Sequence, residues 1–280
     1  MENTLPNTIK TELESGRRAL FVLNHSGGKD SQAMTILVER TLRAWPNAIA
    51  VMVHANLPEV DWPGIEQHIR SNHPGLRLEI CTARWQDGSE KRLLDMVERR
   101  GMWPSSQQRY CTSDLKRGPI GVVIRGLAKE LGVDLVINCS GERHAESDDR
   151  AKLVELEIDE RLSVNKRFQR TVYRWRPILT LTEADVRQVV ADAGQKLHPA
   201  YDAGMSRLSC CFCIMAKKAD LLTAARLQPE LARRYGALER KIGHTMKQPA
   251  AGEAKVYLDE LLAFAAQPKA PAAPVQLTLI

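Results

Sequence analysis

The sequence predicts an α/β fold built on a parallel β-sheet, and two patterns support this prediction. Short runs rich in branched apolar residues have the length of buried strands, at residues 19–23, 49–53, 76–80 and 134–138. Segments with helical periodicity lie between them, among them residues 33–38, 93–97 and 122–131. Such alternation is typical of a Rossmann-like parallel sheet covered by helices on both faces.

The pattern changes after about residue 200. Leucines there recur at helical spacing, and no strand pattern separates them. Residues 267–280 hold three prolines among alternating alanines, which is typical of a flexible tail. We therefore predict an α/β domain at 1–200, a cysteine-containing loop with a helical region at 201–266, and a tail at 267–280.

Composition excludes some classes of protein. No apolar stretch approaches the ~20 residues that a membrane span needs, and residues 1–10 lack the apolar core of a signal peptide. We therefore expect a cytoplasmic protein with no membrane partner. In that compartment the six cysteines are expected to be free thiols or metal ligands rather than disulfides. The net charge of +6 favours an anionic partner.

The most informative motif is Ser-Gly-Gly-Lys-Asp-Ser, which follows the first predicted strand and begins the first predicted helix. Glycines permit a tight turn, and N–H groups at a helix start converge on an anion. The Asp30 carboxylate suits Mg²⁺. The spacing differs from the Walker A and dinucleotide-binding motifs. The motif predicts a nucleotide phosphate site; the alternative is a glycine turn before a capped helix. Its residues are Ser26, Gly27, Gly28, Lys29, Asp30 and Ser31.

Ligands of parallel sheets bind at the carboxyl ends of the strands. His54 and Ser140 follow predicted strands, as Ser26 does, so we expect the three to share a crevice. His25 precedes the loop and is expected to support its packing, and His144 falls in a further predicted site loop.

The cysteine pattern is the second feature with chemical meaning. Cys210 and Cys213 form a C-x-x-C pair, and Cys111 lies far upstream. This spacing lets two thiolates reach one metal centre from a turn, and thiolates favour an iron–sulfur cluster or zinc. Cys211 is a further candidate ligand, although adjacent side chains tend to diverge. The alternative is a group of redox-inert thiols. The other two cysteines end predicted strands and are expected in the core: Cys81 and Cys139.

The phosphate motif resembles the PP-loop of the N-type ATP pyrophosphatases, enzymes that split ATP between its α- and β-phosphates. Further segments resemble the phosphoadenosine phosphosulfate (PAPS) reductase family, and the resemblance covers roughly residues 20–215. It implies an adenine nucleotide alpha hydrolase-like fold. The segments are residues 54–63, the Gly-Glu-Arg loop at 141–150, residues 175–186 with 198–201, and the stretch 204–213 that holds the C-x-x-C pair.

Two departures from the sulfonucleotide reductases favour ATP as the substrate. Those enzymes carry a modified phosphate loop, whereas the loop here is intact. They also attack sulfate with a cysteine near the C-terminus, whereas the last cysteine here is Cys213. The chain thus looks more like the branch that contains the DNA phosphorothioation protein DndC. The three-cysteine arrangement also resembles the tRNA thiolation enzymes.

The resemblance implies roles for particular residues. Lys29, Lys116 and Arg143 would neutralise charge on the leaving pyrophosphate, with Mg²⁺ on Asp30. A [4Fe–4S] cluster, with zinc as the lesser alternative, would sit on Cys111, Cys210 and Cys213. The remaining nucleotide-binding residues would be His54, Asn56 and Gly141.

A basic segment completes the candidate features. Residues 161–176 carry six cations and three aromatic residues with no acid, a composition that favours contact with DNA or tRNA. The alternative is a solvated loop leading into a strand, with some arginines on the triphosphate. The cations are Arg161, Lys166, Arg167, Arg170, Arg174 and Arg176.

Together these features predict an enzyme that adenylates an acceptor with ATP, releases pyrophosphate and supports sulfur transfer to a nucleic acid or a small molecule. Expected partners include a sulfur donor or the proteins of a defence system. The rivals are a sulfonucleotide reductase and a nucleotide-sensing component of a defence complex.

Overall fold

The fold is organised around one six-stranded sheet, seen in a computed structural model that describes residues 4–164, 169–248 and 254–265. The strand order is β3-β2-β1-β4-β6-β5, with β5 antiparallel to β6 at one edge and all other pairs parallel. This confirms the predicted α/β class, and the four predicted strands are each found within two residues of their expected limits. The strands are β1 (Ala19–Asn24), β2 (Ala48–Ala55), β3 (Arg77–Cys81), β4 (Leu135–Cys139), β5 (Leu156–Ile158) and β6 (Thr171–Trp175).

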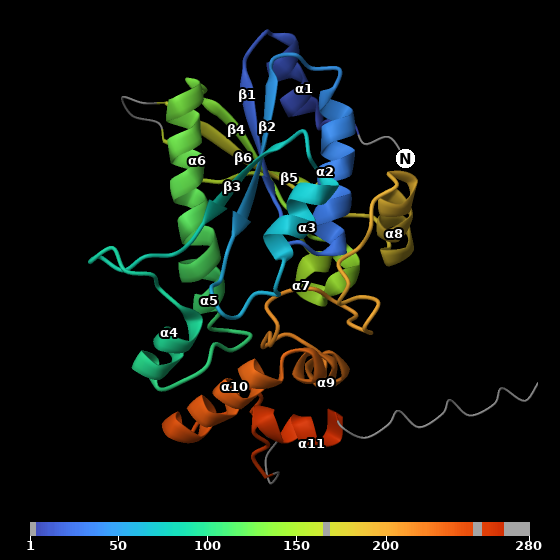
Figure 1. Ribbon diagram of the computed structural model, residues 1–280. Coiled ribbons are helices and arrows are strands. Elements are labelled where there is room, and N and C mark those ends of the chain that lie inside the picture. The colour runs from blue at the N-terminus through green and yellow to red at the C-terminus, as the bar shows by residue number, and fades with distance from the viewer. Residues whose placement is uncertain (1–3, 165–168, 249–253, 266–280) are drawn as a thin grey trace, which may run out of the picture.

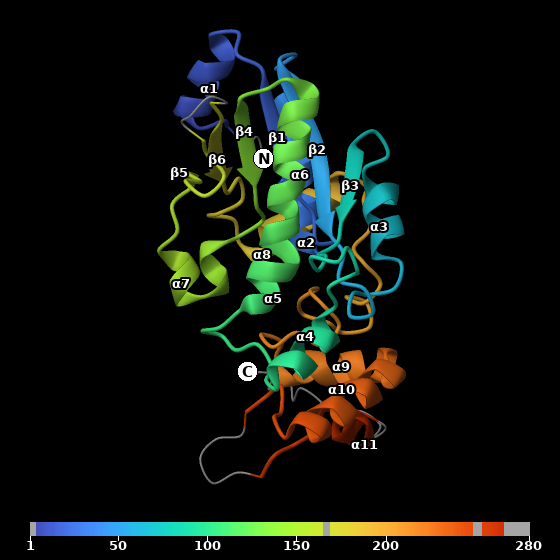
Figure 2. The ribbon, with the colours of Figure 1, turned by 90° about the vertical axis from the view of Figure 1, so that its left-hand side faces the viewer.

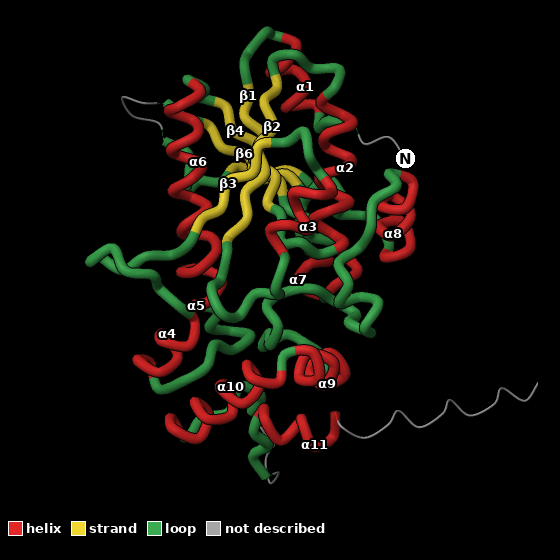
Figure 3. The backbone as a smooth tube through the Cα atoms, viewed as in Figure 1, coloured by secondary structure: helices red, strands yellow, loops and turns green. Residues whose placement is uncertain are grey.

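Helices cover both faces of the sheet (Figures 1 and 3). The alternation of side chains along β1 explains this arrangement. Phe21 and Leu23 pack in the core cluster that includes α2, whereas Leu20 and Val22 pack in the cluster that includes α6. The predicted core positions of Cys81 and Cys139 are confirmed, since both are buried. One face carries α1 (Asn7–Glu14), α2 (Lys29–Leu42), α3 (Ile65–Asn72) and α8 (Glu183–Asp192), and the other carries α6 (Gly118–Leu131).

The C-terminal helices lie beyond the carboxyl ends of the strands (Figures 1 and 2). Among the described residues after 200 there are helices and no strands, which confirms the predicted change of pattern. The loop after β2 holds this region in place, since Glu59 pairs with Arg234 at 2.7 Å and the Val60 carbonyl accepts from Cys211 N–H at 2.8 Å. The C-terminal elements are α9 (Lys218–Leu227), α10 (Pro229–Ile242), η3 (Leu258–Glu260) and α11 (Leu261–Ala265), and α4 (Leu93–Arg100) packs beside α10.

Two short segments frame the carboxyl end of the sheet. After α5 (Tyr110–Thr112) the chain forms a π-helical turn, η1 (Ser113–Arg117), which continues into α6. Turns of this kind are frequent at functional sites. The chain after β4 forms η2 (His144–Glu146) and α7 (Asp148–Ala151).

None of the helices in the described part of the chain is both long and apolar enough to span a membrane. The division at residue 200 remains a prediction, and the predicted tail lies outside the described residues.

Candidate nucleotide and thiol site

A crevice opens where the strand order changes direction, between the carboxyl ends of β1 and β4. This is where open α/β sheets bind ligands. The cavity measures about 570 Å³. One wall is formed by the phosphate loop, and others by η1, the turn after β4 and residues 207–208. Ser26 and Ser140 both line it, as the strand ends predict.

Glycine allows the two turns of the site to approach each other closely. Gly27 has φ of +77°, and a Cβ there would lie 2.1 Å from Ile65 Cδ1. A Cβ on Gly141 would lie 2.9 Å from the Asp30 carbonyl carbon and 3.0 Å from Ser31 N. The turn after β4 therefore packs directly on the backbone at the start of α2.

The first N–H groups of the loop donate to side chains of the chain itself. Ser26 N–H donates to Ser31 Oγ at 3.1 Å, and Gly27 N–H donates to His25 Nδ1 at 3.0 Å. Lys29 N–H donates to the Tyr201 hydroxyl at 3.0 Å. His25 therefore supports the loop as predicted. An incoming phosphate would have to replace some of these acceptors.

Asp30 joins the two cations predicted to act on the phosphates. Its Oδ1 accepts from Arg143 Nε at 2.7 Å, and its Oδ2 accepts from Lys29 Nζ at 3.2 Å. Both cationic side chains are buried, and Arg143 also reaches the Leu181 carbonyl at 3.4 Å. In this form both carboxylate oxygens of Asp30 are therefore engaged by cations.

The crevice brings together only part of the predicted nucleotide set. Lys29 and Arg143 lie behind its wall, in contact with Asp30. Neither His54 nor Asn56 lines it, and His54 is buried with Nδ1 at 2.8 Å from the His25 carbonyl. The predicted residues that do line it are Ser26, Gly28, Asp30, Ser31, Lys116 and Gly141.

His144 does not line the crevice either. Its Nε2 lies 2.9 Å from the Leu153 carbonyl, and its backbone N–H donates to the Leu179 carbonyl at 2.8 Å. It therefore braces the turn after β4.

The three predicted metal-binding cysteines lie near Lys116, which itself lines the crevice. Lys116 lies close enough to Cys210, Asp61, Cys213 and Cys111 for negative charge on these groups to raise the pKa of its ammonium. The Cys210 thiol donates to Cys213, which lowers the pKa of Cys213, and Met215 N–H donates to Cys213 Sγ at 3.4 Å. Burial raises the pKa of the Cys111 thiol. The thiols are thus neighbours of the nucleotide crevice.

These thiols do not yet form a metal-ligand set. Within the described residues no three His, Cys, Asp or Glu side chains are placed to hold a metal ion. The Tyr235 hydroxyl, buried near the same cysteines, has no hydrogen-bond partner in the described part of the chain. Three thiols are suitable ligands for an iron–sulfur cluster, but in this structure they are not placed closely enough together to bind one.

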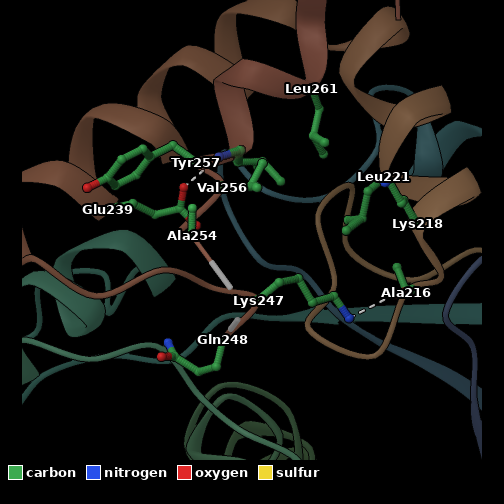
Figure 4. Close-up of a pocket in the computed structure, with 11 residues that line it drawn as sticks. Ala216, Lys218, Leu221, Glu239, Lys247, Gln248, Ala254, Val256, Tyr257 and Leu261 are labelled. Atoms are coloured by element: carbon green, nitrogen blue, oxygen red, sulfur yellow. Dashed lines mark hydrogen bonds between the residues drawn. The ribbon is translucent and has the colours of Figure 1, made fainter. Parts of the chain in front are cut away.

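A second cavity, of about 420 Å³, lies among the C-terminal helices, and its lining includes a lysine that holds the chain just after Cys213 (Figure 4). Lys247 Nζ donates to the carbonyls of Ile214 at 2.5 Å and Ala216 at 2.9 Å, just after Cys213. The buried Glu239 accepts from the N–H groups of Met246 and Leu258. The polar groups of this cavity therefore serve the loop and the helix ends.

The basic segment is a strand in part, and its described cations are mostly satisfied internally. Arg174 pairs with Glu157 and Asp159, and Arg176 pairs with Glu142 and Glu157. Trp175 is fully buried and cannot stack on a base. Arg170 donates to the Leu162 carbonyl, and Arg161 reaches the Arg117 carbonyl at 3.4 Å. Lys166, Arg167 and Phe168 lie outside the described residues.

Sequence reasoning missed the cations of the opposite wall and the tyrosine that contacts the loop. Arg109, Arg117 and Arg207 line the crevice, are exposed, and form no ion pair with a carboxylate of the described residues. Tyr201 and Arg207 both fall in motifs that the sequence marks, but only the fold brings them to the phosphate loop.

Comparison with known proteins identifies a related domain family. The model of the phosphoadenosine phosphosulfate reductase domain matches residues 21–216. An uncharacterized 37.8 kDa protein of Escherichia phage 186 is 32% identical over 151 residues, 53% of this chain and 42% of that protein. The match therefore spans less than half of that relative's length.

Two solved structures are similar at a lower level. PAPS reductase from Candida auris has 12% identity and a TM-score of 0.43, covering 75% of this chain and 98% of its own. The U34-tRNA thiolase NcsA from Methanococcus maripaludis, which carries a [4Fe-4S] cluster, has 13% identity and a TM-score of 0.43, covering 90% and 86%. Because both TM-scores are below 0.5, the fold rests on the strand order and pairing of the sheet. By the match of the domain model over most of its length, the chain belongs to the phosphoadenosine phosphosulfate reductase domain family.

Proposed function

We propose that this chain binds ATP in the crevice and cleaves it to AMP and pyrophosphate, with adenylation of an acceptor as the purpose. One observation carries the proposal. The phosphate loop and Lys116 line a single crevice, and Lys116 neighbours the three cysteines. A site for activation and a group of thiols are therefore adjacent, as sulfur transfer to an activated acceptor requires.

The chemistry proposed for the crevice is a displacement at the α-phosphorus. An acceptor oxygen forms a bond to that phosphorus, the bond to the β-phosphate oxygen breaks, and its electron pair leaves with pyrophosphate. Lys29, Arg143 and Lys116 would stabilise the charge that develops on the leaving group. Mg²⁺ accompanying ATP would have Asp30 as its candidate ligand. A sulfur nucleophile would then displace AMP from the acceptor.

A [4Fe–4S] cluster on Cys111, Cys210 and Cys213 would supply a sulfur-carrying centre beside the crevice. The three thiols and the unpartnered Tyr235 hydroxyl support this donor set, and closer approach of the thiols would be needed.

Product analysis tests the proposed activity. Wild-type protein with ATP and Mg²⁺ is expected to release pyrophosphate and AMP once an acceptor is supplied, and Asp30→Ala is expected to abolish that release. Asp30 is the candidate Mg²⁺ ligand and the one carboxylate of the phosphate loop, so its loss should cost several kcal/mol of transition-state stabilisation. Glu183→Gln, at an exposed carboxylate 4.0 Å from Lys29 Nζ, is the matched control. Equal rates for wild type and Asp30→Ala would reject the assignment.

Metal analysis tests the thiol site separately. After anaerobic reconstitution, wild type is expected to hold iron, and Cys111→Ala, Cys210→Ala and Cys213→Ala are each expected to lose it. The controls are the buried cysteines of the sheet, Cys81→Ala and Cys139→Ala, which should retain iron. Zinc in place of iron would keep the ligand set and remove the sulfur-carrying role.

The family match favours one rival, a sulfonucleotide reductase. Calorimetric titration separates the two, because the intact phosphate loop is expected to bind ATP more tightly than PAPS. A tenfold preference for PAPS, about 1.4 kcal/mol, together with thioredoxin-dependent release of sulfite, would select the reductase. Tight ATP binding without AMP formation would instead select a nucleotide sensor.

A further inference from the structure

Two buried cations of the phosphate site depend on one carboxylate. The side chains of Lys29 and Arg143 are only 4% and 5% exposed. Asp30 pairs with both. Among the described residues, the only other carboxylate within 4.0 Å of either cationic group is that of Glu183, 4.0 Å from Lys29 Nζ. A buried charge is costly unless it is paired, and Asp30 supplies that pairing for both cations.

The pairing has the chemistry of an anion site that is already filled. A carboxylate oxygen and a phosphate oxygen are both charged acceptors, and a guanidinium group binds either of them. The 2.7 Å bond from Arg143 Nε to Asp30 Oδ1 is short, as expected of a charge-assisted hydrogen bond. The Tyr201 hydroxyl, a neutral acceptor, likewise accepts from the Lys29 backbone N–H of the phosphate loop. Groups of the chain itself thus stand where phosphate oxygens are expected.

We propose that Asp30 is an internal counter-anion that the nucleotide phosphates displace from Arg143 and Lys29, an inference that rests on the proposed binding of ATP in this crevice. Phosphate binding is then an exchange of anions. The exchange weakens binding of the metal-free nucleotide, because the phosphates compete with Asp30. It also frees both carboxylate oxygens for the metal ion that arrives with the nucleotide. Asp30 in this way acts as a positioning residue that couples nucleotide affinity to metal.

Packing of the Asp30 backbone keeps its carboxylate beside the two cations. The turn at Gly141 packs against the Asp30 backbone, and a Cβ there would come within 3.0 Å of it. The carboxylate therefore cannot move away from the cations by a shift of the helix start toward β4. Only an arriving anion, or rotation of the Asp30 side chain, releases Arg143.

The test compares wild type with Asp30→Asn in the presence of EDTA, with pyrophosphate and ATP as probes. Asparagine has nearly the same size and keeps an oxygen for Arg143, but it removes the competing charge. Asp30→Asn is expected to bind both probes about tenfold more tightly than wild type without metal, about 1.4 kcal/mol. It is also expected to lose the gain in affinity that Mg²⁺ gives to wild type. Glu183→Gln removes a nearby exposed charge and is expected to change neither quantity.

The outcomes separate the two proposals. Equal or weaker binding by Asp30→Asn in EDTA, with wild type still binding ATP, would overturn the exchange and leave the proposed function standing. Failure of wild type to bind either probe would overturn both. A measurement on wild type covers the case in which the variant does not fold. The NMR signal of the Arg143 Nε–H group is expected to shift when pyrophosphate is added in EDTA, and an unmoved signal would overturn the exchange.

Discussion

At the scale of single residues, Gly141 decides how closely the two turns of the site approach. Its φ is not in the left-handed region, so the requirement for glycine is one of space. A Cβ would meet backbone atoms of Asp30 and Ser31, which cannot rotate away as the end of a flexible side chain can. The close approach of the two turns thus requires a residue without a Cβ at position 141.

We expect Gly141→Ala to weaken ATP binding by about tenfold and to lower the free energy of unfolding by ~1–3 kcal/mol, as overpacking usually does. Calorimetric titration and urea denaturation measure the two effects. Gly126→Ala is the matched control, because a Cβ there meets nothing within 4 Å in the middle of α6. That control should raise stability by ~0.5–1 kcal/mol. Full ATP affinity in Gly141→Ala would show that the turns can separate without cost.

At the scale of elements, the cations of β6 differ from those around η1. Arg174 of β6 faces the acids of the neighbouring edge strand, so its charge is neutralised. Arg109 and Arg117 flank α5 and η1 and form no ion pair with the described carboxylates. The cations available to an anionic acceptor therefore lie around η1 rather than on β6. Arg161, of the predicted basic segment, joins them, because it lines the same crevice and has no carboxylate partner among the described residues.

This contrast predicts which arginines bind a nucleic acid, if one is the acceptor. Arg109→Gln combined with Arg117→Gln should weaken binding of single-stranded DNA or tRNA and make its dependence on log salt shallower by about 1.5, since each lost phosphate contact removes ~0.7–0.9 from the slope. Fluorescence anisotropy over a series of salt concentrations measures this. Arg174→Gln should leave the slope unchanged and lower stability. Undetectable binding of both nucleic acids by wild type at low salt would contradict the prediction that these arginines bind a nucleic acid.

At the scale of the whole molecule, a group of histidines, three buried and His68 half-buried, connects the phosphate loop with α3 and the segment before Tyr201. The ring centroids of His25 and His73 lie 5.4 Å apart, and those of His68 and His198 lie 5.2 Å apart. Burial lowers the pKa of His73 to about 4 and that of His68 to about 4, and it also lowers the pKa values of His25 and His198. The folded chain therefore holds the rings of His68 and His73 neutral until the pH approaches about 4.

The sign of the resulting pH dependence follows from proton linkage. Unfolded histidines titrate near pH 6.5, so the unfolded chain binds more protons between about pH 6.5 and pH 4. Stability should be fully present above pH 6.5 and fall as the pH is lowered through this window. His73, whose side chain is fully buried with Glu39 Oε2 3.7 Å from Nδ1, should contribute up to ~1.4 kcal/mol per pH unit.

Urea denaturation of wild type and His73→Leu at pH 7.5, 6 and 5 checks this expectation. The variant should lose less stability than wild type between pH 6.5 and pH 5, because its one missing imidazole no longer takes up a proton on unfolding. Parallel curves for the two proteins would contradict the assignment of His73.

The sequence predicted the strands of the sheet centre because those strands are buried on both faces and carry nearly continuous branched apolar side chains. It did not predict β5 or identify residues 171–175 as a strand. β5 is a three-residue edge strand, and β6, between β4 and β5, carries half-buried polar residues such as Thr171 and Arg174 among its buried ones. The local pattern therefore carries least information at this side of the sheet, whereas β3, at the opposite edge, was predicted.

The sequence by itself determined the family, the α/β class and the position of the phosphate loop, because a strand, a glycine turn and a helix are adjacent in the chain and their signals are local. Only the tertiary structure decided which distant groups meet there. It brought Arg143 to Asp30, Tyr201 to Lys29 and the Cys210–Cys213 pair to Lys116, and it left His54 and Asn56 out of the crevice lining. The physical reason is that these contacts join segments about 100 or more residues apart. Their meeting is set by the order of the strands and by the packing of the C-terminal helices, which no local pattern encodes.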